Sequence, residues 1–283
     1  MSRFGPAAVG WLDGVAALAA RLASRWGLVL GELFASGASS VVMRCRWPDG
    51  TPAVLKLSPD RALLTKQVEM LRVFASSGRV PAVLSADAEA GAMVLEEVRP
   101  GTVAEDLPQT SLPQQWGGLL AALHGVAPPA RWPWDLRGRC AEAIARIGRR
   151  LAEPAIGARI DEATWRRTTE RAAALLDTQA RLVLLHGDLH LGNVLDGGPS
   201  RGLVAIDPKA CIGDPCFDAV DYVVAGAGHE GVEVRCQRVA IACGLDGDRL
   251  YAWSRVIAPM FAIAHLTHDG PKQAIDELLV LTR

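Results

Sequence analysis

A chain of 283 residues is long enough for one large domain or two coupled ones, and half of its residues are hydrophobic, as in ordinary globular proteins. The 30 basic and 31 acidic side chains nearly cancel, which excludes the strongly basic surface of a nucleic-acid-binding protein. The sequence has no apolar run of about 18 residues and no basic-then-apolar leader, so we expect neither a membrane span nor a secretory signal. With six scattered cysteines, typical of free thiols in a reducing compartment, these features predict a cytoplasmic protein.

The N-terminal part of the chain is rich in predicted strands. Amphipathic patterns predict a leading helix over residues 13–26 and a second helix over residues 61–76. Short apolar or alternating runs predict strands at Val29–Phe34, Ser40–Trp47, Ala53–Leu57, Val80–Ala86 and Ala92–Val98. The Pro-Asp-Gly turn between the second and third of these runs is typical of a hairpin.

Beyond about residue 109 the pattern becomes helical. Amphipathic stretches predict helices at 112–127, 138–152, 161–178, 215–226, 231–243, 248–267 and 271–281. Only one polar loop and its hairpin interrupt them. We therefore predict an α+β protein of the two-lobed, protein-kinase-like kind, with a small β-rich lobe over 1–98 and a larger helical lobe over 99–283.

The polar loop carries the strongest chemical signal. Its sequence from His186 to Asn193 is HGDLHLGN, and Asp207 follows where the next apolar run ends at Ile206. Phosphoryl transfer from Mg-ATP needs one carboxylate that orients the acceptor hydroxyl, and an amide and a second carboxylate that hold magnesium. We assign these roles to Asp188, Asn193 and Asp207, in that order.

Two other interpretations of the loop are weaker. His186, Asp188 and His190 alternate as metal ligands do, but zinc sites usually recruit further Cys or His ligands. The nearest cysteines, Cys211 and Cys216, lack a C-x-x-C spacing. Alternatively, Gly-Asp forms a simple turn, but that interpretation leaves the spacing of Asn193 and Asp207 unexplained.

A lysine on the third predicted strand is the expected phosphate contact. Lys56 is flanked by apolar residues in a chain whose usual base is Arg, which suggests that a compact ammonium matters there. Its expected partner is Glu69, which we expect the apolar neighbours in the following helix to turn inward. The small residues before the second strand, Ser39 among them, let backbone N–H groups approach phosphates, although a surface turn has the same composition.

Two further segments are candidates for ligand contacts. The strand that leads into the junction between the lobes offers Glu96 and Val98 for the adenine. Asp214, followed by proline, has the pattern of a helix N-cap, and Asp218 and Asp221 then lie one turn apart. We expect Asp214 to be a cap and Asp218 an acceptor for loop amides. The alternative places some of these carboxylates around a cationic substrate.

Together these motifs resemble those of the aminoglycoside phosphotransferase superfamily, which has a kinase-like fold. The features that carry the resemblance are His-Gly-Asp-x-His-x-x-Asn, Ile-Asp-Pro in place of Asp-Phe-Gly, and Gly-Asp-Pro-x-x-Asp. The chain is most similar to the streptomycin 6-phosphotransferase and hydroxyurea phosphotransferase branch, from about residue 27 to the last helices. The absence of Asp-Phe-Gly and Ala-Pro-Glu segments counts against a protein kinase.

The resemblance implies an ATP- and Mg²⁺-dependent kinase that phosphorylates a hydroxyl of a streptomycin-type aminoglycoside and so confers antibiotic resistance. Asp188 would be the catalytic base, Asn193 and Asp207 the magnesium ligands, and Lys56 with Glu69 the phosphate clamp. The substrate would be a small cationic molecule, with His190, Asp214 and Asp218 as the candidate contacts. Hydroxyurea, another antibiotic or a metabolite is the alternative acceptor, and a nucleotide-binding module without catalysis is the remote one. The oligomeric state stays open.

Overall fold

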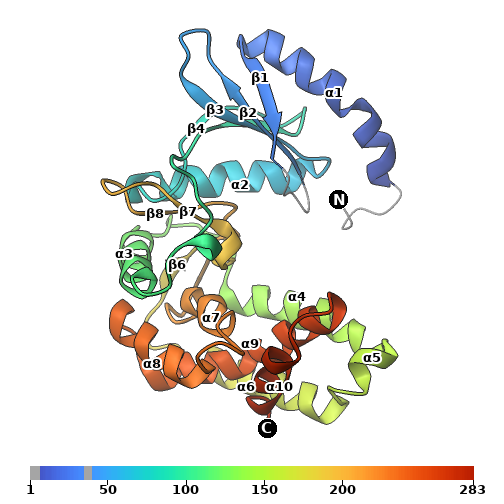
Figure 1. Cartoon of the computed structure of the whole chain (residues 1–283), viewed down its shortest axis with the longest axis vertical. Coiled ribbons are helices and arrows are strands. Elements are labelled where there is room, and N and C mark those ends of the chain that lie inside the picture. Colours follow the sequence, from blue (N-terminus) through green and yellow to red (C-terminus); the bar gives the residue numbers. More distant parts are fainter. Residues whose placement is uncertain (1–6, 35–39) are drawn as a thin grey trace. The chain divides into compact units, whose positions relative to one another are not determined.

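The computed structural model describes residues 7–34 and 40–283, and the chain divides into two compact units (Figure 1). Unit 1 is Met1–Gly101 and unit 2 is Thr102–Arg283. The division falls after Gly101, whereas the sequence pattern placed it after Val98. Ser39, proposed above as a phosphate contact, lies outside the described residues. A β-sheet in unit 1 and a mainly helical unit 2 confirm the predicted α+β class.

Unit 1 is built on a five-stranded antiparallel sheet with the strand order β1-β2-β3-β5-β4. The strands are β1 Val29–Leu33, β2 Val41–Arg46, β3 Pro52–Leu57, β4 Val83–Asp87 and β5 Ala92–Glu96. The predicted hairpin joins β2 to β3, and Gly50 takes the φ of +87° that its turn requires. Lys56 lies opposite Val42 and Met93 in the two neighbouring strands.

Two helices complete unit 1, α1 Ala7–Trp26 and α2 Arg61–Phe74. Helix α1 packs on a buried cluster that includes Ala53, Leu55 and Leu57 of β3. Since successive side chains of a strand point to opposite faces, Lys56 belongs to the face of the sheet that α1 does not cover. Helix α2 begins where the Asp60 side chain accepts a hydrogen bond from the backbone N–H of Leu63 at 2.9 Å.

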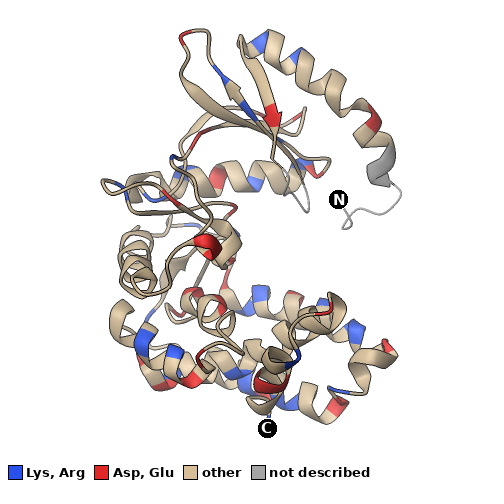
Figure 2. Cartoon of the chain, viewed as in Figure 1, with Lys and Arg blue, Asp and Glu red and all other residues tan. Residues whose placement is uncertain are grey.

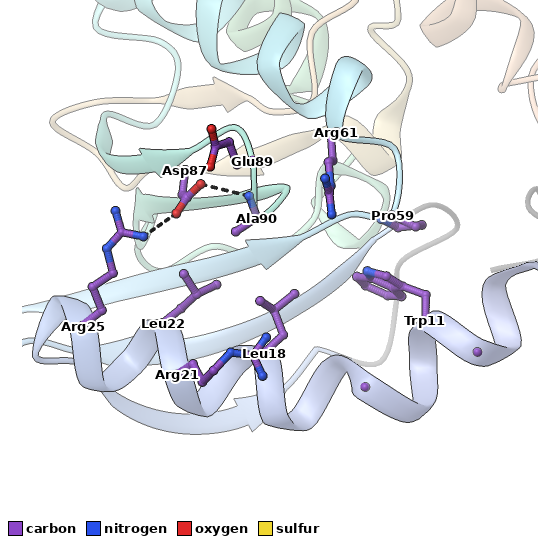
Figure 3. Close-up of a pocket in the computed structure, with 12 residues that line it drawn as sticks. Trp11, Leu18, Arg21, Leu22, Arg25, Pro59, Arg61, Asp87, Glu89 and Ala90 are labelled. Atoms are coloured by element: carbon purple, nitrogen blue, oxygen red, sulfur yellow. Dashed lines mark hydrogen bonds and ion pairs between the residues drawn. The ribbon is translucent and has the colours of Figure 1, made fainter.

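Helix α1 leaves a cavity of about 690 Å³ against the turn between β4 and β5 (Figure 3). Trp11 and Leu18 of α1 line one side of it, and Pro59 and Ala90 line another. At one end, Arg25 donates a hydrogen bond to Asp87 at 2.5 Å, which ties the end of the helix to the sheet.

Unit 2 is mainly helical. Its helices are α3 Leu112–His124, α4 Leu136–Gly148, α5 Pro154–Gly157, α6 Glu162–Asp177, α7 Phe217–Val224, α8 Val232–Cys243, α9 Gly247–Thr267 and α10 Lys272–Val280. Trp116 of α3 stacks on Tyr222 of α7 with ring centroids 4.6 Å apart, and both are buried. A Cβ at Gly117 would lie 2.3 Å from the carbonyl oxygen of Ala242, so glycine lets α3 and α8 approach closely. Acidic and basic residues are interspersed along these helices (Figure 2).

Two short strand pairs interrupt the helices and hold the polar loop. Strands β6 Val183–Leu185 and β9 Cys211–Gly213 form one antiparallel pair. Strands β7 Val194–Asp196 and β8 Leu203–Ala205 form the predicted hairpin. The sequence pattern predicted neither β6 nor β9, each of which contains only three residues.

The structure also describes the cysteines and the length and apolar character of the helices. All six cysteines are free thiols, and five of them are buried. Across the described ranges, the structure has no helix that combines the length and the apolar character needed to cross a membrane.

Candidate active site

Backbone hydrogen bonds bring the predicted site residues of unit 2 to one place. The N–H of Ile206 donates to the carbonyl of Asn193 at 2.8 Å, and the N–H of Lys209 donates to the carbonyl of His186 at 2.9 Å. The loop before β7 is therefore joined at both ends to the segment that follows β8. Asp188 lies in this loop, Asn193 at its exit and Asp207 beside it.

The carboxylate of Asp188 is paired with two cations. Arg139 of α4 donates from Nη2 to Oδ1 at 2.9 Å, and the ammonium of Lys209 lies 2.7 Å from Oδ2. Burial by itself raises the pKa of the Asp188 carboxyl, but the positive charges of Lys209 and Arg139 outweigh burial and lower it. About a fifth of the side chain is exposed, 22%, so the ionised carboxylate is still partly open to solvent.

Arg139 is placed by the first turn of α4. The carboxylate of Asp135 accepts a hydrogen bond from the N–H of Gly138 at 2.7 Å and caps the helix. Just before the cap, the carbonyl of Trp134 accepts a hydrogen bond from the N–H of Ile212 in β9 at 3.0 Å. The start of α4 is therefore attached to the strand pair that carries the loop.

Asn193 is oriented by the loop itself. Its Nδ2 donates to the backbone carbonyl of Asp188 at 2.9 Å. Because the amide nitrogen makes this bond, Oδ1 is left as an acceptor, and no hydrogen bond to it is found within residues 7–34 and 40–283. That oxygen is a suitable ligand for a hard cation.

Asp207 has a φ of +57°, in the left-handed region that residues other than glycine rarely adopt. A strained backbone of this kind is common at ligand sites, where the surrounding structure enforces it. The described part of the chain has no cluster of three or more His, Cys, Asp or Glu that would make a complete metal cage. An amide and one carboxylate suit Mg²⁺, which keeps waters and substrate phosphates as its other ligands. Asn193 and Asp207 therefore fit that ion.

A buried carboxylate holds the backbone of the loop. Asp218 of α7 accepts hydrogen bonds from the N–H groups of His186 at 2.7 Å and Gly187 at 2.8 Å, and its Oδ2 lies 3.0 Å from Nε2 of His124. Burial raises the pKa of Asp218, but the hydrogen bond and charge of His124 outweigh burial and lower it. Gly187 has a φ of +78°, and a Cβ there would lie 2.4 Å from the carbonyl oxygen of Lys209. Asp218 is thus the acceptor for loop amides.

Asp214 caps the turn that leads into helix α7, because its Oδ1 accepts a hydrogen bond from the N–H of Cys216 at 3.0 Å. Helix α7 begins at Phe217, with Cys216 at the cap position. The Asp214 carboxylate is buried, accepts a hydrogen bond from Trp253 Nε1 at 2.8 Å and pairs with Arg249. Both Asp214 and Asp218 therefore point into unit 2, where internal partners occupy their oxygens. His190, the third predicted substrate contact, has an exposed side chain.

In unit 1, the prediction that the Glu69 side chain points inward is wrong. Lys56 is 3% exposed, but Glu69 is exposed and shares the outer face of α2 with Thr65 and Arg72, its neighbours one turn away. The buried polar residue of this helix is Gln67.

The two predicted adenine contacts lie at the end of β5. Val98 is buried, and Glu96 accepts a hydrogen bond from the N–H of Ala82 at 3.1 Å. Both residues therefore have defined positions in unit 1.

The sequence pattern missed two residues of the site and considered a third, Asp221, only as one of several carboxylates that could surround a cationic substrate. Arg139 lies 49 residues before Asp188 in an ordinary helix, so nothing local marks it. Lys209 follows Asp207 closely and could have been found as a cation within the motif. Asp221 lies one turn beyond Asp218, and burial together with the charge of Asp188 raises its pKa to about 7.

Comparison with known sequences identifies several phosphotransferases that are similar to this chain. The model of the phosphotransferase enzyme family matches residues 31–253. Streptomycin 6-kinase of Streptomyces glaucescens is 33% identical over 218 residues, which cover 76% of this chain and 68% of that protein. Streptomycin 6-kinase of Streptomyces griseus is 34% identical over 211 residues, 74% of this chain and 66% of that protein. Hydroxyurea phosphotransferase of Kitasatospora aureofaciens is 33% identical over 250 residues, 86% of this chain and 71% of that protein.

Solved structures with the same fold are more distant in sequence. Macrolide 2'-phosphotransferase type I superposes with a TM-score of 0.60 at 19% identity, over 95% of each chain. A thermostable mutant of aminoglycoside phosphotransferase APH(4)-Ia, in a ternary complex with ADP and hygromycin B, gives a TM-score of 0.63 at 17% identity, over 93% of this chain and 96% of that one. Choline kinase LicA from Streptococcus pneumoniae gives 0.65 at 12% identity, over 95% and 99%. At these identities the similarity establishes the fold alone.

Proposed function

The chain belongs to the phosphotransferase enzyme family, and we propose that it transfers the γ-phosphoryl group of ATP to a hydroxyl of streptomycin or a closely related aminoglycoside. The observation that carries the proposal is that two backbone hydrogen bonds, Ile206 to Asn193 and Lys209 to His186, join the loop that holds Asp188 and Asn193 to the segment that holds Asp207. Two relatives named streptomycin 6-kinase support the acceptor, and this chain spans about two thirds of their length.

In the proposed reaction Asp188 accepts a hydrogen bond from the acceptor hydroxyl and directs its oxygen at the phosphorus. Arg139 and Lys209 keep the carboxylate ionised and in place. Phosphoryl transfer has a loose transition state, so positioning and charge supply most of the rate gain. Asn193 and Asp207 are the groups that would hold Mg²⁺, whose charge offsets that of the phosphates.

Unit 1 supplies the nucleotide contacts in this proposal. Lys56 would contact the phosphates, and Val98, Glu96 and their backbone groups would contact the adenine. The support is positional: Lys56 is the buried lysine of β3, and the other two residues lie at and just beyond the end of the adjacent strand β5.

Hydroxyurea is a second candidate acceptor. The hydroxyurea phosphotransferase of Kitasatospora aureofaciens aligns with 86% of this chain, more than either streptomycin 6-kinase does. The same carboxylate and phosphate contacts serve a small neutral acceptor, so only the acceptor contacts differ between the two candidates.

An acceptor panel tests the proposal. Purified protein is incubated with Mg-ATP and streptomycin, hydroxyurea, hygromycin B or no acceptor, and ADP release is followed together with the mass of the acceptor. We expect a gain of one phosphate on streptomycin, and no such gain in the Asp188→Asn variant. Phosphorylation of hydroxyurea in place of streptomycin would favour the second candidate, and no phosphorylated acceptor in any reaction would contradict the proposal.

A further inference from the structure

The cavity beside helix α1 is lined by none of the residues that we assign to phosphoryl transfer. It has a volume of about 690 Å³ and lies between α1 and the turn that joins β4 to β5 (Figure 3). Pockets of this size take small organic molecules. The phosphotransferase family model matches residues 31–253, so α1, which forms one wall of the cavity, lies outside the matched segment. The family's activity therefore does not account for this wall.

Two glycines of α1 keep the cavity open. Gly10 and Gly14 both line it, and a Cβ built at either position would meet no packed neighbour within 4 Å. Glycine destabilises the interior of a helix relative to alanine. Close packing does not require glycine at these two positions, in contrast to Gly117 of α3. Their missing side chains leave space for a ligand beside the helix.

Apolar side chains of α1 form part of the cavity wall. Trp11, Leu18 and Leu22 lie on one face of the helix, and Trp11 and Leu18 are only partly buried against the sheet. The indole of Trp11 extends from α1 toward Pro59 (Figure 3). An indole beside aliphatic side chains can hold the flat apolar part of a ligand.

Three arginines line the same cavity, and the structure uses only one of them. Arg25 is paired with Asp87 at 2.5 Å, so these two charges largely cancel. In the described part of the chain, the guanidinium groups of Arg21 and Arg61 have no hydrogen-bond or ion-pair partner. Glu89 is the other acidic residue of the lining, so two unpaired cations face one carboxylate. The cavity therefore has an excess of positive charge.

The two unpaired arginines come from different elements. Arg21 extends from α1, and Arg61 is the first residue of α2 (Figure 3). The stem of Arg61 runs along the β4–β5 turn, since a Cβ built at Gly91 would lie 3.2 Å from its Cγ. Two guanidinium groups that reach one cavity from separate elements can bind the same anionic group.

We propose that this cavity binds a small organic anion. The flat apolar body of the ligand lies against Trp11 and Leu18, and its carboxylate, sulfonate or phosphate group accepts charge-assisted hydrogen bonds from Arg21 and Arg61. The site is separate from the nucleotide and acceptor contacts described above, and it does not depend on the proposed phosphotransferase function.

Two fluorescent probes that differ in one charged group test the proposal. Anilinonaphthalene sulfonate is an aromatic anion, and phenylnaphthylamine has the same rings without the sulfonate. Each probe is titrated into the full chain, and its dissociation constant is measured by fluorescence. We expect one saturable site for the anion. The double variant Arg21→Gln with Arg61→Gln should raise the dissociation constant of the anion about tenfold and change that of the neutral amine less than about twofold.

Two charge variants complete this comparison. Arg46→Gln with Arg72→Gln is the matched control, because both arginines are exposed residues of unit 1 outside the cavity lining. It should leave both dissociation constants at their wild-type values. Glu89→Gln should tighten binding of the anion, since it removes the carboxylate that opposes it. Equal losses for the two probes in the Arg21 and Arg61 double variant would overturn recognition of the anionic group.

A cavity-filling variant tests the location of the site. Gly14→Leu places a side chain in the open space and favours the helix, so it should weaken both probes about tenfold while circular dichroism shows a folded protein. Gly118→Leu is its control, because Gly118 is an exposed glycine of α3 whose Cβ would also meet no packed neighbour within 4 Å. Unchanged affinities in Gly14→Leu, or no saturable binding of the anion to wild type, would overturn the proposal.

Discussion

The ammonium of Lys209 lies 2.7 Å from Oδ2 of Asp188, while Arg139 holds the other oxygen of the same carboxylate at 2.9 Å. With both oxygens paired, the carboxylate has a fixed orientation and stays ionised. A paired, ionised carboxylate is a weak proton acceptor but a good hydrogen-bond acceptor. This suits phosphoryl transfer, in which the nucleophile needs orientation more than early deprotonation.

Removal of Arg139 should therefore affect turnover more than nucleotide binding. We expect Arg139→Gln to lower kcat about tenfold, because it removes one charge-assisted hydrogen bond that stabilises the transition state. The KM for ATP should change less than about twofold. Arg139→Lys should recover part of the loss. Arg137→Gln is the control, because Arg137 lies on the same helix and its one ion-pair partner among the described residues is the exposed Asp177. An equal kcat in Arg139→Gln and wild type would contradict the positioning role.

Asp218 should contribute strongly to stability. Its carboxylate is buried and accepts two backbone hydrogen bonds from the loop, so Asp218→Ala leaves His186 and Gly187 with unsatisfied N–H groups. We expect the free energy of unfolding to fall by about 3 kcal/mol, measured by urea denaturation followed by circular dichroism. The surface variant Asp177→Ala should lose less than about 0.5 kcal/mol. A loss of the same size in both variants would argue against the buried network.

The raised pKa of Asp221 predicts a specific pH dependence of stability. The folded protein binds this proton more tightly than the unfolded chain, whose pKa stays near 3.8. The stabilising contribution is therefore complete below pH 3.8 and is lost as the pH rises through about 7. Asp188, Asp218, Arg139 and Lys209 are the charged groups that act on Asp221.

Asp221→Asn should remove this dependence. Since solvent partly screens the half-buried carboxyl, we expect the variant to gain about 1–2 kcal/mol relative to wild type between pH 5 and pH 8. The measurement is the urea midpoint at each pH, with Asp177→Asn as the control. A constant difference between Asp221→Asn and wild type across this range would exclude a carboxyl that titrates near pH 7 at this position.

The parts of the site that lie close together in sequence could be predicted, and those assembled by packing could not. Asp188, Asn193 and Asp207 could be recognised because the loop and one short hairpin determine their spacing. Arg139 lies 49 residues before Asp188 on a helix whose start is attached to β9, so no local pattern contains it.

Helix phase explains the error at Glu69, and tertiary partners explain what the sequence could not show at Asp214. Glu69 was expected to turn inward because its neighbours are apolar, but the residues one turn away, Thr65 and Arg72, place it on the outer face. Asp214 keeps a capping bond through Oδ1, which accepts from the N–H of Cys216, while Arg249 and Trp253 of α9 bind its Oδ2. The local signal for a cap therefore holds, and the tertiary partners add to it.

Burial also distinguishes Lys56 from Glu69, the two residues of the expected phosphate clamp. We expect Lys56→Met to weaken ATP binding about tenfold, since it removes a compact positive charge from a buried position on β3, whereas Glu69→Gln should change it less than about twofold. Nucleotide affinity is measured by calorimetric titration with Mg-ATP, and Lys66→Met on the exposed face of α2 is the control. If Glu69→Gln weakened binding as much as Lys56→Met, the two residues would have to meet in the nucleotide-bound protein, which requires α2 to rotate by part of a turn. Equal affinities of wild type and Lys56→Met would remove Lys56 from the nucleotide site.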